Sequence, residues 1–217
     1  MRLRADDDDF SIELSLDSEK PVVLQGDNGL SQKSAEAGNA SYYYSLTRMH
    51  TEGVVRIGDN VFEVSGSSWM DREWSTTALA EYQEGWDWFA LQLSDGRDLM
   101  YYQLRLRDGG VDSYSSGVIV GVDGQTVKLT RQDVRIEVMD TWNNDRGTDY
   151  PSRWRLSVPS QELSIEIIPY LDDQELDVSV RYWEGAVRFE GIAAGVPVSG
   201  VGYIEMTGYA EDSGGRS

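Results

Sequence analysis

The sequence predicts an all-β protein built from antiparallel strands, and two observations carry this prediction. Valine, isoleucine, leucine, tyrosine and tryptophan recur in short alternating runs, and no stretch sustains the period of an amphipathic helix. Turn residues that suit tight hairpins separate these runs at Gly58-Asp59-Asn60, Asp95-Gly96, Asp108-Gly109-Gly110 and Asp123-Gly124. Regular spacing of about ten residues between turns is typical of an antiparallel sandwich or a closed barrel.

The expected strands follow one another along nearly the whole chain. Alternation places them at 10–16, 42–49, 53–57, 61–67, 86–93, 98–107, 116–122, 126–129, 134–141, 152–158, 163–168, 180–190 and 198–209. Residues 27–40 are polar and contain glycine, so a loop with a short helical turn is expected there. Residues 76–85 are expected to form a short helix or crossover that ends at Gly85, because glycine favours a helix C-terminus.

A domain boundary is expected at this crossover. Residues 1–80 hold too few strands for an independent barrel and are predicted to be part of a first domain. Residues 81–210 hold about eight strands, which is enough to close one complete C-terminal barrel. Residues 211–217 are polar and rich in glycine, and a disordered tail is expected there.

Composition excludes several classes of chemistry. The 217-residue chain has 19 basic and 38 acidic residues, a net charge of −19, and therefore repels nucleic acid. It has no cysteine and one histidine, so disulfides and thiolate metal sites are excluded, and we expect no metal and no cofactor. Two explanations of the acidity stay open: a surface suited to a high-salt cytoplasm, or the coding bias of a GC-rich genome.

The sequence shows no membrane span and no leader peptide. No run approaches the roughly 20 apolar residues of a span, and the acidic N-terminus lacks the apolar core of a signal peptide. A cytoplasmic protein is the default expectation. The periplasm or the cell exterior stays open if the sequence is the later part of a longer chain.

Four of the seven tryptophans lie near one acid in the sequence: Trp69, Trp74, Trp86 and Trp88. If this segment is extended, Trp69 and Asp71 project to the same face. Indoles that exclude water raise the pKa of a carboxyl, which prepares a general acid, and their faces can stabilise a carbocation. The structural alternative is that the tryptophans fill a barrel core while Asp71 caps a turn or pairs with Arg72.

Acids also alternate with tyrosines near the C-terminus. Tyr182 and Glu184 share one face of an expected strand, and Tyr203 and Glu205 share one face of another. Inside a barrel such an acid either has a tyrosine or arginine partner or serves the ligand. Both explanations stay open, and these four residues join the tryptophans at 74, 86 and 88 as candidate ligand-binding residues.

A third cluster is the run Tyr42-Tyr43-Tyr44. Tyr42 and Tyr44 share one face of an expected strand, where they either pack against neighbours or orient a substrate or a water. The single histidine, His50, follows the end of that strand and is expected to be exposed.

Motifs along the chain resemble one family. They are SWMDREW, GWDWFALQL, DLMYYQLR, YPSRWRLSVP and YWEGAVRFEG with GYIEMTGY, and they resemble the AttH-like and carotenoid 1,2-hydratase (hydroxyneurosporene synthase) family from Phe10 to Tyr209. The resemblance implies two lipocalin-like barrels with an apolar pocket in and between them. This chain would hold the last strands of the first barrel and the whole second barrel.

The same resemblance implies roles for particular residues. Asp71 holds the place of the aspartate proposed as the acid in the hydratases, although their pattern has tyrosine where this chain has Trp69. Their upstream His-x-Trp pair aligns with Tyr42 and Tyr44, so the histidine of the hydratase pattern is missing here.

Three functions are compatible with the resemblance. An enzyme would hydrate a C=C bond of an apolar isoprenoid- or polyketide-like ligand, with Asp71 as general acid and Tyr42 or Tyr44 orienting the water. A non-catalytic carrier would deliver a hydrophobic molecule to a membrane or a transporter. A pericyclic cyclase would hold a polyene in its reactive shape. An exposed half-barrel edge also favours a homodimer or pairing with a missing N-terminal domain.

Overall fold

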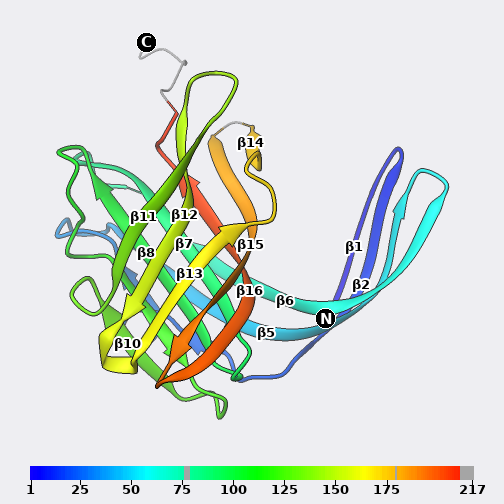
Figure 1. Ribbon diagram of the computed structural model, residues 1–217, viewed down its shortest axis with the longest axis horizontal. Coiled ribbons are helices and arrows are strands. Elements are labelled where there is room, and N and C mark those ends of the chain that lie inside the picture. Colours follow the sequence, from blue (N-terminus) through cyan, green and yellow to red (C-terminus); the bar gives the residue numbers. More distant parts are fainter. Residues whose placement is uncertain (76–78, 179, 211–217) are drawn as a thin grey trace.

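A computed structural model describes residues 1–75, 79–178 and 180–210 of the chain. In these parts the protein is all-β, as predicted, and its strands form two antiparallel sheets (Figure 1). Strands up to residue 74 make the first sheet, and strands from residue 83 onwards make the second.

The first sheet has six strands arranged around one very long strand. They are β1 (Arg2–Asp7), β2 (Phe10–Ser18), β3 (Val23–Leu24), β4 (Leu30–Gln32), β5 (Ala40–Ile57) and β6 (Asn60–Trp74). The predicted strands 42–49 and 53–57 are one strand, β5, because Gly53 stays in the sheet and pairs with Leu14 on β2 and Val64 on β6. The sequence does not predict β1, whose six residues include only one large apolar side chain, Leu3.

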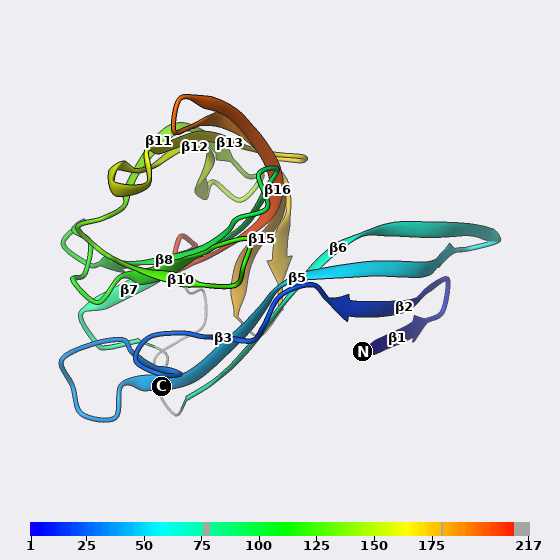
Figure 2. The same cartoon turned by 90° about the horizontal axis from the view of Figure 1, so that it is seen from below.

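The second sheet has ten strands and curls on itself (Figure 2). They are β7 (Gln83–Leu93), β8 (Asp98–Leu106), β9 (Ser116–Val120), β10 (Thr126–Thr130), β11 (Arg135–Asn143), β12 (Asp149–Val158), β13 (Leu163–Pro169), β14 (Glu175–Asp177), β15 (Arg181–Ala193) and β16 (Val196–Thr207). Their order is β10-β9-β8-β7-β16-β15-β13-β12-β11, with β14 beside β15. Within the described chain β10 and β11 are not paired, so the predicted second barrel is a curled sheet that is open between them.

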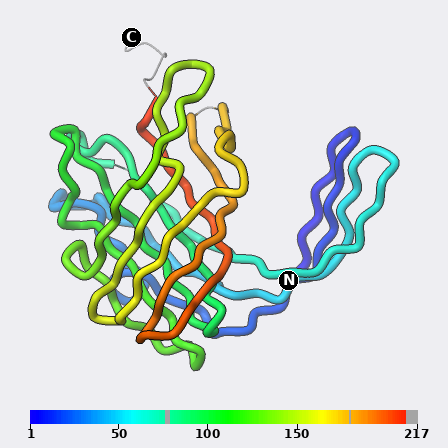
Figure 3. Tube along the Cα trace, in the orientation of Figure 1, coloured from blue at the N-terminus to red at the C-terminus, as the bar shows by residue number. Residues whose placement is uncertain are grey.

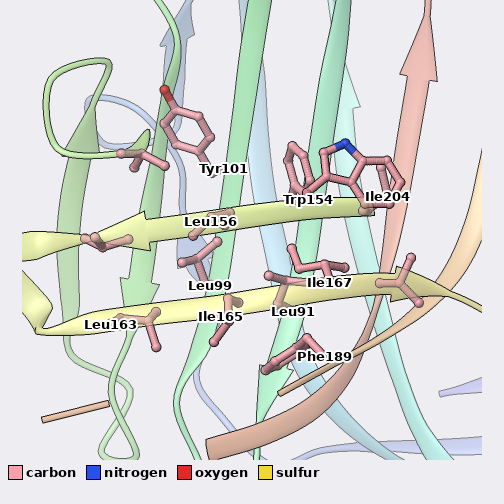
Figure 4. Close-up of a cluster of buried hydrophobic side chains, with 14 of the residues drawn as sticks. Leu91, Leu99, Tyr101, Trp154, Leu156, Leu163, Ile165, Ile167, Phe189 and Ile204 are labelled. Atoms are coloured by element: carbon pink, nitrogen blue, oxygen red, sulfur yellow. The ribbon is translucent and has the colours of Figure 1, made fainter. Parts of the chain in front are cut away.

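The curled sheet encloses the main hydrophobic core (Figure 4). Trp154 and Trp183 are fully buried there with ring centroids 6.0 Å apart, and Phe89 packs edge-on against Trp154. Aromatic side chains therefore fill the space that an open lipocalin barrel would leave for a ligand. The tryptophans that the sequence singles out, at 69, 74, 86 and 88, are not members of this core.

Two predicted irregular segments differ from expectation. Of the helix expected at 76–85, residues 76–78 lie outside the described residues, residues 79–82 form a bend and a turn, and β7 begins at Gln83. Gly85 lies within β7, where a Cβ atom would come within 2.1 Å of the carbonyl oxygen of Thr207. The loop 27–40 contains the short strand β4 in place of a helical turn. The predicted tail at 211–217 lies outside the described residues.

The outer face of the curled sheet packs against the first sheet. Tyr43 and Val23 of the first sheet join Met100, Tyr102 and Val118 of the second in a smaller buried cluster. Asp98, at the start of β8, is fully buried and binds across the joint: Arg48 Nη2 lies 2.7 Å away, Lys20 Nζ 2.8 Å and Thr47 Oγ1 2.8 Å.

Beyond this joint the first sheet projects away from the rest of the molecule (Figure 3). The projecting part consists of β1, β2 and the connected ends of β5 and β6. Apolar side chains on it are exposed to solvent, among them Leu3, Phe10, Ile57 and Phe62.

Glycines in β15 and β16 allow the tight curvature of the second sheet, and Gly185 gives a testable case. A Cβ atom at Gly185 would lie 1.9 Å from the ring of Trp183, whose Nε1 donates to the carbonyl oxygen of Asp172 at 2.7 Å. Gly185→Ala is expected to destabilise the protein by about 1–3 kcal/mol in urea denaturation, because the ring must leave its position. Gly66→Ala is the control, since its Cβ would meet nothing within 4 Å. Equal loss in both variants would contradict the packing argument.

Candidate functional site

Two adjoining cavities lie between the two sheets. The first, of about 390 Å³, is lined by Lys33, Tyr43, Asp71, Glu73, Trp74, Ser75, Trp86, Trp88, Tyr102, Leu104 and Glu205. The second, of about 460 Å³, is lined by Ser67, Ser68, Trp69, Asp71, Trp88, Ala90, Gln92, Tyr170, Ala186, Val187, Val201, Gly202, Tyr203 and Glu205. Asp71, Trp88 and Glu205 line both cavities, so two carboxyl groups stand where the cavities meet.

Asp71 is held by donors from three directions. β5 and β6 pair so that Ser45 lies directly opposite Asp71, and the Ser45 hydroxyl donates to it at 2.5 Å. Trp69, two residues earlier on the same face, donates its Nε1 hydrogen to the same carboxyl oxygen at 2.8 Å. The Tyr43 hydroxyl donates to the other oxygen. Because a carboxylate offers about four acceptor positions, one remains for a proton.

A second indole sets the direction of the hydrogen bond between Tyr43 and Asp71. Trp88 Nε1 donates to the Tyr43 hydroxyl at 3.0 Å, so the Tyr43 proton points to Asp71. Burial raises the pKa of Asp71, the hydrogen bonds from Ser45, Tyr43 and Trp69 lower it, and the net direction is upward. The environment therefore makes Asp71 a weaker acid than an exposed aspartate.

Glu205 stands on β16, in the facing sheet. Trp86 Nε1 donates to it at 2.6 Å, and Glu184 lies directly opposite it on β15. Burial raises the pKa of Glu205, the Trp86 hydrogen bond lowers it, and the charges of Glu184, Asp71 and Glu73 raise it further, to about 7. Both carboxyl groups where the cavities meet therefore hold a proton more readily than in water.

The raised pKa makes the charge of Glu205 a cost to the folded state. The pKa of the Glu205 carboxyl is 4.5 in the unfolded chain and about 7 in the folded protein. The free energy of unfolding therefore falls as the pH rises from 4.5 to about 7. Glu205→Gln removes the charge and is expected to stabilise the protein by up to about 3 kcal/mol near pH 8, with little change near pH 4. Chemical denaturation at both pH values measures this. The exposed Glu190→Gln on β15 is the control, and equal behaviour of the two variants would contradict the expected window.

A third acid in the site, Glu73, already has a cationic partner. Glu73 accepts the Ser41 hydroxyl, and Lys33 Nζ lies 2.9 Å from its carboxyl. The Lys33 ammonium also lies over the Tyr102 ring, 3.8 Å from its centroid. The first cavity therefore has a polar end at Lys33 and Glu73, whereas apolar residues such as Ala186, Val187 and Val201 line the second.

In the described parts of the chain, no three histidine, aspartate or glutamate side chains are placed to hold a metal ion. Across the same residues, no helix is both long and apolar enough to cross a membrane.

A model of a known protein family matches nearly the whole chain. The family model described as AttH-like matches residues 1–209. The chain belongs to the AttH-like family. No curated protein sequence matches it.

Solved structures agree with this AttH-like assignment. A crystal structure of a protein from Nitrosomonas europaea assigned to AttH is 36% identical with a TM-score of 0.87, and the match covers 97% of this chain and 65% of that one. Kievitone hydratase from Nectria haematococca is 22% identical with a TM-score of 0.77, over 95% of this chain and 64% of that one. A structure of CghA with Sch210972 is 12% identical with a TM-score of 0.53, and the match covers 93% of this chain and 64% of that one.

These comparisons confirm the predicted resemblance and the lipocalin-like fold of the AttH-like chain. At 22% and 12% identity, the last two likenesses show a shared fold and no more. The chain spans about two thirds of the length of these solved relatives.

The structure brings together some of the AttH-like chain's predicted site residues. Trp69 and Trp86 donate to the two carboxyl groups, Trp88 donates to the Tyr43 hydroxyl and lines both cavities, and Tyr203 lines the second cavity. Tyr182 packs against Trp86 with ring centroids 6.3 Å apart, whereas Glu184 lies opposite Glu205 in the register. These acids lie on the outer face of the curled sheet and not inside the barrel, because Trp183 and Ile204, next to them, turn inward.

The expected positions of Tyr42 and Tyr44 are wrong. Both side chains lie on the face of β5 that points away from Asp71. There each ring packs on Trp74 with ring centroids 6.2 Å apart, and Tyr42 is 61% exposed. Neither can orient a water beside Asp71. Trp74 reaches the first cavity only at its rim, since it is half exposed. His50 is exposed, as predicted.

Sequence reasoning missed Tyr43 and Ser45. They occupy the other face of the same tyrosine run, and the buried face of β5 continues through Ser41, Thr47 and Met49. The sequence carries no signal for this choice, because a register shift between Leu46 and Met49 in the pairing of β5 with β6 sets Ser45 opposite Asp71.

Proposed function

We propose that this AttH-like protein binds an apolar, unsaturated, isoprenoid- or polyketide-like ligand between its two sheets and adds water across a C=C bond. One observation carries the proposal: Asp71, a partly buried carboxyl with a raised pKa, stands where two cavities meet and has indoles beside it. The volumes of these cavities fall within the range of small-molecule sites.

Asp71 acts as the general acid in this proposal. Its O–H bond breaks as the π electrons of the ligand form a C–H bond, which leaves a carbocation on the neighbouring carbon. The faces of Trp69 and Trp88, whose rings meet edge-on at 6.4 Å, can stabilise that cation. A water then adds its oxygen to the cation and releases one proton to solvent, and Asp71 takes up one proton in return, so one alkene and one water are consumed.

The relative named kievitone hydratase supports this class of reaction, since it shares the fold over 95% of this chain. The AttH-like relative from Nitrosomonas europaea is more similar but carries no reaction in its name. The support is therefore for a hydratase-like site, and extraction of the protein from its host identifies the ligand.

Organic extraction of the protein from its own host, followed by mass spectrometry, tests the proposal. A retained polyene together with a species heavier by one water is the result expected for a hydratase. The same protein incubated with farnesol in water enriched in heavy oxygen should release a labelled alcohol. Extraction of an apolar ligand without any labelled product would overturn hydration.

A carrier without chemistry is the second candidate, and one observation favours it. Asp71 has three donors, which is how a purely structural carboxylate is satisfied. A carrier would pass its ligand to a membrane or a transporter unchanged. Quenching of tryptophan fluorescence by farnesol, equal in the wild type and in Asp71→Asn and without product, is the result expected for it.

A further inference from the structure

A second carboxyl faces Asp71 across the site. Asp71 is on β6 of the first sheet and Glu205 is on β16 of the second, and both line both cavities. A ligand that extends from one cavity into the other passes between them. Its double bond would then have one carboxyl group on each side.

Glu205 has acceptor capacity that the fold does not use. Among the described residues it accepts one side-chain hydrogen bond, from Trp86 Nε1. Asp71 accepts three, and Glu73 is occupied by Ser41 and Lys33. Since an ionised carboxylate has about four acceptor positions, Glu205 can still accept a proton or a water hydrogen from the cavity.

The charges around Glu205 come from each element packed against it. β6 contributes Asp71 and Glu73, β15 contributes Glu184, and the loop before β5 contributes the ammonium of Lys33, which is paired with Glu73. Tyr182, Tyr203 and Trp86 complete its surroundings. With so much like charge, Asp71 and Glu205 resist ionising together, and the pair retains one proton near neutral pH.

We propose that Glu205 is the second catalytic carboxyl of this site and accepts the proton of the water that adds to the ligand. The inference rests on the proposed hydration. The proton of Asp71 forms the C–H bond, a lone pair of water forms the C–O bond to the cation, and one O–H bond of that water breaks toward Glu205. Glu205 then returns its proton to Asp71 through solvent, so each cycle consumes one alkene and one water.

Hydration of farnesol in water enriched in heavy oxygen tests this role across a range of pH. The active pair holds one proton, on Asp71, so the wild type should lose activity as the pair gives up this proton at a pH of about 7. Glu205→Gln should lower kcat about 10²–10⁴-fold with KM changed only a few-fold, and this limb of the profile should move to lower pH. Glu205→Ala should regain part of its activity with added formate, a carboxylate small enough for the vacated space. Glu190→Gln, on the exposed face of β15, should behave as wild type.

The possible outcomes test the proposed hydration and the proposed role of Glu205 separately. No labelled alcohol from the wild type overturns the proposed hydration, and the role of Glu205 with it. Labelled alcohol from the wild type and from Glu205→Gln at similar rates overturns only the role of Glu205. A lower kcat in Glu205→Gln with an unchanged pH profile and no response of Glu205→Ala to formate would make Glu205 a structural residue and also overturn it.

Discussion

Asp71→Asn is expected to lower the rate of farnesol hydration about 10²–10⁴-fold while farnesol binding changes only a few-fold. Proton transfer from a positioned acid contributes this much to a reaction, and an amide cannot give the proton. Turnover is measured by mass spectrometry of the labelled alcohol, and binding by quenching of tryptophan fluorescence. Full turnover in Asp71→Asn would exclude the mechanism.

Asparagine is the informative replacement because the surroundings can accept it. Trp69 Nε1 and the Ser45 hydroxyl can keep donating to the amide oxygen, and the Tyr43 hydroxyl can turn to accept the new N–H group. The fold is therefore expected to survive, and the effect on turnover is separated from any effect on stability. Asp140→Asn, on the exposed part of β11, is the matched control.

Conversion of the polyene extracted from the host, followed by chromatography and mass spectrometry, separates the hydratase from the pericyclic alternative, because a cyclised product keeps the mass of the polyene. A cyclase depends on the shape of the pocket, so Asp71→Asn should be mild while filling the second cavity should abolish activity. Ala186→Leu fills that cavity, because Ala186 lines it together with Ala90 and Gly202. Loss of turnover in Ala186→Leu together with near-normal turnover in Asp71→Asn would favour cyclisation over hydration.

Asp98→Asn is expected to destabilise the protein by about 3–5 kcal/mol. The carboxylate of Asp98 is fully buried and lies within 2.8 Å of both Lys20 Nζ and Arg48 Nη2. With asparagine in its place, two largely buried cations lose their counter-charge at the joint between the sheets. Urea denaturation followed by tryptophan fluorescence measures the loss.

Asp95→Asn, in the same turn, is the matched control for Asp98. Asp95 pairs with Arg97 at 2.7 Å, but its side chain is 37% exposed. Solvent screens such a pair, and its loss is expected to cost at most about 1 kcal/mol. If Asp98→Asn cost no more than Asp95→Asn, the joint would not depend on the buried charge cluster, and packing of Tyr43 against Met100 and Tyr102 would have to hold the sheets together.

The core of the second sheet illustrates how far local patterns extend. The sequence predicts strands there from alternation, and the structure contains them, with Gly96, Gly109 and Gly124 at φ of 85°, 84° and 80° in the predicted turns. The alternation does not predict which tryptophans enter that core. Trp154 and Trp183 do so and Trp86 and Trp88 do not, because the curl of the sheet makes one face of β7 its outer side.

The sequence by itself determined the local arrangement of this protein: the strands, the glycine turns, and the common face of Trp69 and Asp71. These depend on a period of two residues and on turn conformations, which act over a few neighbouring residues. The family resemblance, spread over the whole chain, was also visible in the sequence and is confirmed.

Only the tertiary structure decided which residues meet at the site. Both faces of β5 mix polar and apolar residues, so its pattern does not say whether Tyr43 or its neighbours Tyr42 and Tyr44 turn toward the second sheet. The pairing of β5 with β6 and the packing of the sheets make that choice. The same packing brings Glu205 to Asp71 from the other end of the chain, since distant strands meet only when the sheets close on each other.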